Sequence, residues 1–385
     1  MRNAVVVSAV RTAVARARKG SFINTRVDDL GAIVVKEAVA RVKGLDPAEI
    51  EDVIVGCAMP EGEQGMNVAR IISLLAGLPL SAAGTTVNRF CGSSLQAINM
   101  AAQAIMTGNG DVQVAAGVEH MTHVPMGGFN PSPNPKFFSG DFPPAYIPMG
   151  MTAENLADKY NIGREAQDEY AAWSHQKAAR ATKEGHFGKE IVPVEVEIEG
   201  QKRTLTADEC IRPDTTVESL AGLKAAFKEG GTVTAGNSSP LNDAAAACVL
   251  MSEERAKALG AGPCFRIVAM AVAGCDPAIM GIGPVPAVHK VLKRAKMTLK
   301  DIDVIELNEA FAVQNLAVIQ ELGLDRSKIN PRGGGVSIGH PLGATGARIM
   351  ATLVHEMIDH NWTIGMETMC IGGGQGIATI IERVR

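Results

Sequence analysis

Several features that would assign the chain to a familiar class are missing from its 385 residues. Its seven cysteines are scattered singly, so neither a C-x-x-C metal pair nor a disulfide framework is indicated. No apolar run is long enough to cross a bilayer, and no signal-peptide pattern follows Met1. The net charge is −4 and no long basic run appears, which argues against nucleic-acid binding. These absences predict a cytoplasmic protein with no membrane span, no nucleic-acid partner and no bound metal.

Aromatic residues are also scarce, at 4%, whereas glycine (41) and methionine (17) are abundant. This composition predicts a core of small side chains with many tight turns rather than an aromatic-rich β-sandwich. The length indicates two or three domains.

Short β-branched runs alternate with longer segments of helical periodicity in both halves of the chain. The runs that predict buried strands are 3–9, 52–55, 112–116, 267–273, 303–307 and 364–369. The segments that predict helices are 27–42, 93–106, 310–322 and 344–357. This alternation predicts an α/β fold in which helices cover both faces of the strands.

The two halves also look like copies of each other. The run Asp52-Val53-Ile54 recurs as Asp303-Val304-Ile305, an offset of 303 − 52 = 251 residues. The same offset carries Cys91 to Leu342, two residues from His340, and carries Glu119 to Cys370. Because the landmarks share one offset, we predict a duplicated α/β unit.

An inserted region from about His120 to Asp243 separates the copies. Its stretch from Pro125 to Pro148 is too rich in proline for a helix or a central strand. Two helices are expected to follow, the first capped by Thr152 and the second running over 164–183. The insertion could bind substrate or serve as a surface tether, and its composition favours neither.

The segment from Thr86 to Gln96 holds the first candidate for chemistry. A strand ends there, and a turn places Cys91 at a helix start, with Gly92 leaving room for close approach. Free N–H groups and the positive dipole end of a helix favour a thiolate, which a nucleophilic cysteine needs. The alternative is a buried cysteine that serves only as a small apolar side chain.

Three further stretches combine glycine with reactive side chains. The segment Asn330–Gly346 surrounds His340 with glycines, which implies close backbone approach by a ligand or another loop. It contains neither the dinucleotide fingerprint nor the P-loop pattern. The segment Thr368–Gly376 repeats the order strand, cysteine, glycine turn around Cys370. In Glu306–Ala312, Asn308 could simply cap the following helix.

In this order the four stretches resemble the thiolase family over essentially the whole chain. The matching motifs are Asn88–Ser94, Asn308-Glu309-Ala310-Phe311, Gly339-His340-Pro341-x-Gly343-x-x-Gly346 and Cys370-x-Gly372-Gly373-Gly374-Gln375-Gly376. The segments 87–97 and 123–126 look most like the degradative 3-ketoacyl-CoA thiolases of fatty-acid oxidation.

The resemblance implies a fold of two duplicated α/β halves, with mixed five-stranded sheets in an αβαβα layered core. It also implies an N-terminal half at 1–119 and 243–265, an inserted loop domain at 120–242 that binds CoA, and a C-terminal half at 266–385.

The catalytic roles implied by the resemblance concern five residues. Cys91 would accept the acyl group after His340 takes its proton, and Cys370 would exchange a proton with the carbon that becomes the methyl group of acetyl-CoA. One oxyanion site would use His340 and a water held by Asn308, and the other the backbone N–H groups of Cys91 and Gly372.

Coenzyme A is implied as a co-substrate, with no permanently bound cofactor. The positions implied to contact it are Arg212, Ser219, Phe227, Ser239, Met149, Met280 and Phe311. The chain departs from common family patterns at Pro331-Arg332, at Pro240 and at Pro148, which bears on substrate length and CoA fit. The family further implies a homodimer or homotetramer, and a hydratase–dehydrogenase subunit is a further candidate partner.

Other functions stay open at this point. Acetyl-CoA C-acetyltransferase, also called acetoacetyl-CoA thiolase, is the alternative within the same class. From another class, a non-catalytic acyl-CoA- or lipid-binding protein of the same fold is the alternative, because a fold does not fix a function. A decarboxylating ketosynthase would use two histidines, or a histidine and an asparagine, where this chain has Cys370.

Overall fold

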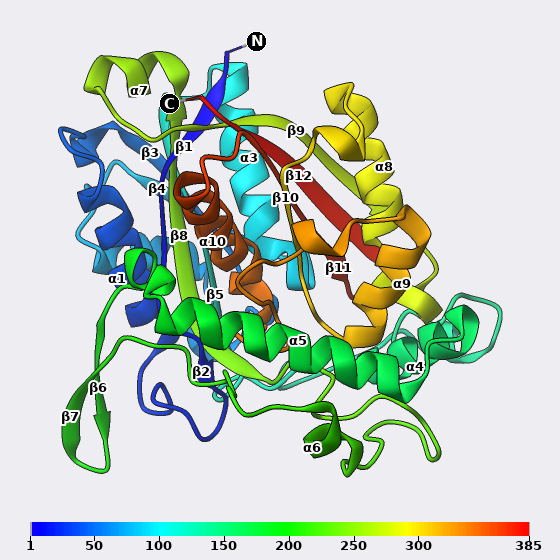
Figure 1. Ribbon diagram of the computed structural model, residues 1–385. Helices are drawn as coiled ribbons and strands as arrows, with labels where there is room; N and C mark the ends of the chain where they lie inside the picture. Colours follow the sequence, from blue (N-terminus) through cyan, green and yellow to red (C-terminus); the bar gives the residue numbers. More distant parts are fainter. Residues whose placement is uncertain (1, 385) are drawn as a thin grey trace.

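β-Branched and small apolar runs form the strands of one long sheet in the computed structural model, which describes residues 2–384 (Figure 1). The strands of the first half are β1 (Ala4–Arg11), β3 (Ile50–Gly56), β4 (Ala83–Val87), β5 (Val112–His120) and β8 (Asn242–Ser252). Those of the second half are β9 (Phe265–Gly274), β10 (Val304–Leu307), β11 (Ile364–Ile371) and β12 (Gln375–Arg383).

The two halves repeat one strand order, which confirms the predicted duplication. The first half runs β3-β5-β8-β1 and the second runs β10-β11-β12-β9. In each half the first pair is parallel and the next two pairs are antiparallel. The strand β4 adds a parallel edge to the first half, beside β3.

The first half has the expected five strands, whereas the second half has four. Its fifth position is reduced to a single parallel bridge between Ile305 and Ile329. Asn330 has a φ of +45°, so the chain turns away immediately after Ile329 instead of extending along β10. The two halves are also not separate, because Val5 and Val6 of β1 pair with Arg266 and Phe265 of β9.

Helices cover both faces of the strands and also fill the space between the two halves, as the αβαβα layering predicts (Figure 1). The first outer layer holds α1 (Val27–Ala40) and α2 (Val68–Leu75). The central layer holds α3 (Ser93–Thr107) and α10 (Thr345–Asp359). The second outer layer holds α8 (Pro284–Ala295) and α9 (Ala312–Leu322).

The core is divided by the sheets in the same way. Val249 of β8 packs in the outer core under α1, whereas its neighbour Leu250 packs in the central core with α3 and α10. This alternation follows from the two-residue period of a strand. The central helices approach closely at their first turns, since a Cβ on Gly346 would lie 2.3 Å from the backbone nitrogen of Leu95. The active-site candidates lie at this meeting point of α3 and α10.

The insertion between β5 and β8 lies across the lower face of the molecule in Figure 1. Its elements are α4 (Met149–Tyr160), α5 (Arg164–Lys183), the hairpin β6 (Val194–Ile198) and β7 (Gln201–Leu205), and α6 (Val217–Ala221). The remaining short elements are β2 (Ala15–Arg16) and α7 (Glu253–Leu259). None of the helices within residues 2–384 is both long and apolar enough to traverse a membrane.

Two expectations about the insertion have different outcomes. The second helix has the predicted bounds, and the proline-rich stretch holds only one short 3-10 turn at Pro135–Phe138. The predicted cap at Thr152 is wrong, because α4 begins three residues earlier, at Met149. Pro148 has a φ of −58°, which suits a residue that opens a helix, and the Thr152 hydroxyl instead donates to the Met149 carbonyl at 2.6 Å.

Candidate active site

The turn that carries Cys91 is held in a strained shape by its own side chains. Phe90, directly before it, has a φ of +43°, a left-handed conformation that costs a non-glycine residue roughly 1–2 kcal/mol. The Asn88 side chain accepts a hydrogen bond from the Phe90 N–H at 2.8 Å. The Ser93 hydroxyl accepts from the Arg89 N–H at 2.9 Å and donates to the Phe90 carbonyl at 2.7 Å. These contacts fix Cys91 where α3 begins.

Cys91 is nearly buried, with 9% of its surface exposed. Burial raises the pKa of its thiol to about 11, although the backbone N–H groups of Gly372 and of Cys91 itself act in the opposite direction. The N–H groups at the helix start therefore act in the expected direction, but desolvation outweighs them in the resting state. A Cβ on Gly92 would lie 2.6 Å from the Ile371 side chain, so glycine is needed for this close approach to β11.

The second cysteine, Cys370, lies near the end of β11 and is fully buried. Burial raises the pKa of its thiol well above the usual value, and negative charge on Cys91 or Cys275 would raise it further. The turn that carries Cys91 packs against the end of β11 that carries Cys370, since a Cβ on Gly372 would lie 3.6 Å from the Phe90 ring. The two cysteines come from different halves of the chain and are 279 positions apart (370 − 91 = 279).

Hydrogen bonds hold both the backbone and the ring of His340. Its backbone N–H donates to the Asn242 side chain at 2.8 Å, and its Nδ1 lies 2.6 Å from the Thr345 hydroxyl oxygen. Because the Thr345 hydroxyl donates to the Pro341 carbonyl at 3.0 Å, we assign the proton of the neutral ring to Nδ1. The Nε2 lone pair then accepts from the Asn308 side-chain nitrogen at 3.4 Å. Burial, with a further contribution from Arg348, lowers the pKa of His340 to about 3.

Asn308 does not cap the helix that follows it, since α9 begins at Ala312 with Phe311 as its cap residue. Its backbone N–H instead donates to the Thr368 carbonyl at 3.0 Å, which places it beside the strand that carries Cys370. Its side-chain oxygen is buried and has no hydrogen-bond partner among the described residues. An amide held in this way can accept a hydrogen bond from a water molecule.

The glycines before His340 allow the chain to pass against Glu309. A Cβ on Gly334 would lie 2.5 Å from the Glu309 side chain, and one on Gly335 would lie 2.5 Å from its carbonyl oxygen. The Glu309 carboxylate accepts hydrogen bonds from Ser174 at 2.6 Å and from Asn330 at 2.9 Å. The sequence left two explanations for these glycines, a ligand or another loop in close contact with the backbone. Contact with another loop explains Gly334 and Gly335.

A positioning residue that the sequence reasoning did not select as a site residue is Glu119, at the end of β5. Its buried carboxylate accepts from the backbone N–H groups of Ala58 and Gly343, both at 2.8 Å, and from the Gln64 side chain at 3.0 Å. It thereby ties the loop that follows His340 to the loop that the Asn88 side chain contacts through the Ala58 carbonyl at 3.0 Å. In the internal repeat, Glu119 corresponds to Cys370 by the offset of 251 residues, and this correspondence could have identified it as a site residue.

Four of the positions expected to contact CoA lie around this centre. The Phe227 ring lies edge-on to the Phe311 ring, with centroids 6.2 Å apart. A Cβ on Gly372 would lie 3.6 Å from the Met149 sulfur. The Ser239 N–H donates to the Ala310 carbonyl at 3.0 Å.

The other three expected CoA positions are placed differently. Met280 is buried in the outer core with α8 and α9. Arg212 and Ser219 are exposed on the insertion, where the Ser219 hydroxyl completes the cap of α6 by accepting from the Thr216 N–H at 3.0 Å. Within the described residues, no contact joins Arg212 or Ser219 to the four positions above.

One group of side chains has the spacing of a metal site. Ligand atoms of Glu63, His120 and His123 all lie within 4.8 Å of one another. The ring nitrogens, however, already have protein partners. His120 contacts the Phe22 carbonyl at 3.2 Å and the His123 N–H at 3.2 Å, and His123 contacts Glu63 at 3.1 Å and the Ile23 carbonyl at 2.8 Å. This network explains the cluster as a tie between two loops.

Comparisons with known proteins match the chain from end to end. Residues 4–254 match the family described as "Thiolase, N-terminal domain", and residues 261–383 match "Thiolase, C-terminal domain". The curated 3-ketoacyl-CoA thiolase of Marinobacter nauticus is 53% identical, with 100% of this chain and 99% of that protein covered. The one of Hahella chejuensis is 51% identical over the same shares.

Two solved structures are similar to the chain at the level of the fold and the sequence. The Bacillus anthracis acetyl-CoA acetyltransferase gives a TM-score of 0.92 at 43% identity. The human mitochondrial 3-ketoacyl-CoA thiolase gives a TM-score of 0.91 at 40% identity. Each comparison covers 100% of this chain and 99% of the other.

Proposed function

Since the chain belongs to the thiolase family, we propose that it cleaves 3-ketoacyl-CoA with CoA, giving acetyl-CoA and a shortened acyl-CoA. It is an acyltransferase, and its function is that of a 3-ketoacyl-CoA thiolase in fatty-acid β-oxidation. The observation that supports the chemistry is the packing of the turn that carries the buried Cys91 against the end of β11 that carries the buried Cys370.

In the first step His340 acts as the base for Cys91. A neutral imidazole whose Nε2 carries no proton, and accepts only a long contact of 3.4 Å from Asn308, can take the thiol proton as the sulfur attacks the 3-keto carbon. The sulfur–carbon bond forms, and the protonated Nε2 becomes a donor toward the new oxyanion. A water held by the unpartnered Asn308 oxygen would be the second donor at this site.

In the second step the bond between C2 and C3 breaks, leaving the acyl group on Cys91 and the enolate of acetyl-CoA. Cys370 supplies the proton for the enolate carbon, and its raised pKa keeps the thiol protonated at neutral pH for that task. Backbone N–H groups of Cys91 and Gly372 stabilise the thioester oxygen.

The third step returns the enzyme to its resting state. Incoming CoA gives its thiol proton to the Cys370 thiolate and attacks the acyl carbon. The acyl–sulfur bond to Cys91 breaks, and the leaving sulfur recovers its proton from His340. All protons are thereby balanced, and CoA is consumed as a co-substrate while no other cofactor is needed.

We extend the proposal to the binding of CoA and to the setting of the enzyme. Met149, Phe227, Phe311 and Ser239 would line the thioester end of the site, with Met280 in the wall behind them. Arg212 and Ser219, both exposed, would meet the nucleotide end. The chain boundaries of the two halves and the 120–242 loop domain, a cytoplasmic location, a homodimer or homotetramer, and a hydratase–dehydrogenase partner all belong to this proposal.

Acetyl-CoA C-acetyltransferase activity is the second candidate. It is supported by the similarity to the Bacillus anthracis acetyl-CoA acetyltransferase. Thiolysis rates for acetoacetyl-CoA and for medium- and long-chain 3-ketoacyl-CoA substrates separate the two activities. We expect the longer substrates to be cleaved, and activity confined to acetoacetyl-CoA would reject the first candidate.

The nucleophile is tested with Cys91→Ala. We expect kcat for thiolysis to fall by roughly 10⁴-fold or more, because no other group can carry the acyl intermediate. Intact mass spectrometry after mixing with a 3-ketoacyl-CoA should show one acyl adduct on the wild type and none on this variant. Cys248→Ala is the matched control, since Cys248 is buried in the core and has no role in the mechanism. A wild type without an adduct would favour the non-catalytic acyl-CoA-binding protein.

A further inference from the structure

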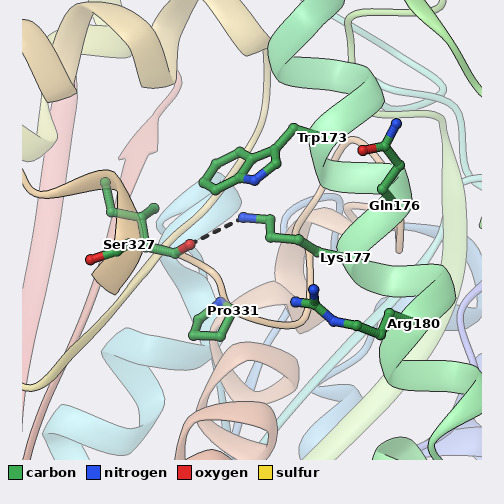
Figure 2. A pocket seen from close by; sticks show the side chains of 7 residues that line it. Trp173, Gln176, Lys177, Arg180, Ser327 and Pro331 are labelled. Atoms are coloured by element: carbon green, nitrogen blue, oxygen red, sulfur yellow. Dashed lines mark hydrogen bonds between the residues drawn. The ribbon is translucent and has the colours of Figure 1, made fainter.

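A cavity outside the proposed acyl-transfer site lies between α5 and the segment 327–331. Its volume is about 240 Å³, and its lining residues are Trp173, Gln176, Lys177, Arg180, Ser327, Ile329 and Pro331. Trp173, Lys177 and Arg180 follow one another at helical spacing, so α5 presents them on one face (Figure 2). None of the seven belongs to the proposed catalytic or CoA-binding residues.

The charged side chains that line this cavity are all positive. Lys177 and Arg180 line it, and no lining residue carries a carboxylate. The Arg326 guanidinium lies nearby, 5.0 Å from the centre of the Trp173 ring. Within the described range 2–384, Arg180 has no ion pair or side-chain hydrogen bond, and the Arg326 guanidinium contacts the Tyr170 and Trp173 rings without an ion pair. The acid beside the mouth, Asp325, accepts from the Ser327 hydroxyl at 2.7 Å.

Lys177 is the buried member of the set, with 5% of its surface exposed. Its ammonium group donates to the Ile329 carbonyl at 3.1 Å, the contact drawn in Figure 2, and lies 3.2 Å from the centre of the Trp173 ring. An ammonium group has three N–H donors, and only one is used by a protein acceptor here. A buried cation with unused donors beside a cavity is a site for an acceptor group.

The charged groups around Lys177 leave its ammonium group available. Burial lowers its pKa to about 8, and the carboxylates of Glu309, Glu306 and Glu356 act against that shift, while Arg326 adds to it. The Glu309 carboxylate makes its hydrogen bonds to Ser174, Tyr170, Asn330 and the Val336 N–H, not to Lys177. At neutral pH the amine is therefore mostly charged without an adjacent counter-ion in hydrogen-bond contact.

We propose that this cavity binds a small oxyanion, the phosphate or carboxylate group of a small ligand, between Lys177 and Arg180. Lysine provides a compact point charge, and the planar guanidinium provides paired donors that fit two oxygens of one anion. The volume is below the roughly 300–1,000 Å³ of sites for drug-sized ligands, so the bound part is small. This inference does not depend on the proposed acyl transfer.

The chain offers its own reporter for a binding experiment. It has two tryptophans, of which Trp173 lines the cavity and Trp362 stacks on His360. In a Trp362→Phe background, fluorescence therefore reports on Trp173 alone. Titration with sulfate, whose charge does not change near neutral pH, should give a saturable change beyond that of chloride at equal ionic strength. A response that chloride reproduces would overturn the proposal.

Matched variants on the same helix locate the bound anion. Arg180→Gln removes a lining charge, and Lys183→Gln removes an exposed charge that does not line the cavity. We expect about tenfold weaker sulfate binding for the first, the value of a charge-assisted hydrogen bond, and little change for the second. Equal weakening by both variants would mean a general surface field and would contradict a site. Both positions are exposed, so neither variant should prevent folding.

The pH dependence and the choice of anion complete the test. Affinity for sulfate should be weaker one pH unit above the Lys177 pKa of about 8 than one pH unit below it, because the amine loses its proton as the pH rises. If the affinity for sulfate stays the same across that range, Lys177 is excluded as a ligand. Parallel titrations with phosphate and acetate distinguish the two sources of the oxyanion: tighter phosphate binding indicates a phosphorylated ligand, and tighter acetate binding indicates a carboxylate.

Discussion

The resting charge state of the reactive pair follows from the burial of single residues. The pKa of about 11 for Cys91 and of about 3 for His340 means that thiol and imidazole are both neutral at pH 7. The enzyme therefore does not store a thiolate–imidazolium pair and forms the thiolate only as the substrate is attacked.

This charge state can be measured by alkylation of the free enzyme with iodoacetamide. The rate at Cys91 should rise steadily with pH, by about tenfold per unit, from neutral pH toward the pKa of about 11, because only the thiolate reacts. The Cys91→Ala variant corrects for labelling of other cysteines. A rate that is constant from acidic to neutral pH would reveal a preformed ion pair and contradict the proposed resting state.

The sequence predicted the proposed catalytic residues and missed several residues that position them. Cys91, His340 and Cys370 stand in glycine-rich turns whose pattern is unusual. Thr345 and Asn242, which orient His340, are ordinary polar residues whose partners depend on the folded positions of distant segments. Glu119 is similar, because its three donors come from two distant loops: Ala58 and Gln64 follow β3, and Gly343 follows His340.

At the scale of elements, the strands and helices around the site carry buried charge that their sequence pattern does not require. Glu306 of β10 and Glu367 of β11 are fully buried near Arg348, and Glu356 of α10 is fully buried 3.6 Å from Arg332 Nε. Burial raises the pKa of each carboxyl group, to about 7 for Glu306. Both oxygens of Glu367 lack hydrogen-bond partners within the described residues. Such a group opposes folding when it is ionised.

Replacing Glu367 with leucine should therefore stabilise the protein at alkaline pH, by about 1–3 kcal/mol in the free energy of unfolding. Since the folded pKa of Glu367 lies above the unfolded value, the wild type loses stability as pH rises from about 4.3, and the gain disappears below that pH. Urea denaturation at acidic and alkaline pH measures both values. Glu367→Gln is the control for shape, and a destabilising leucine at alkaline pH would contradict the argument.

The boundaries of elements followed the sequence where periodicity and turn residues agreed. The helix 164–183 and the strand ends near Leu307 were predicted because apolar spacing and polar flanks mark them. The start of α4 was missed because Pro148 and Thr152 both suit a helix start, and packing on the second half selects the earlier one. The single-residue bridge at Ile329 depends on the left-handed Asn330, which no local pattern announces.

At the scale of the molecule, one edge of the sheet is apolar and uncovered. The strand β4 ends the strand order, and the adjoining α2 region exposes Met66, Leu74, Leu75 and Leu80. Open strand edges and exposed apolar patches are typical of association surfaces. This surface supports the proposed homo-oligomer, and the prediction that follows from it is a contact on the first half.

Light scattering of the purified protein should give the mass of a dimer or tetramer. The variant Leu80→Asp should weaken association by tenfold or more, because a charge would be buried at the contact. Leu223→Asp, on the insertion and also exposed, is the matched control and should leave the mass unchanged. A monomeric wild type would refute the association proposal.

The sequence by itself determined the α/β class, the duplication and the residues with reactive side chains, because periodicity and turn chemistry are local properties. Only the tertiary structure packs the Cys91 turn against the end of β11, sets the His340 Nδ1 against the Thr345 hydroxyl, and places Lys177 and Arg180 around one cavity. Those outcomes depend on contacts between segments far apart in the chain, and on the burial that the contacts create. No single segment contains that information.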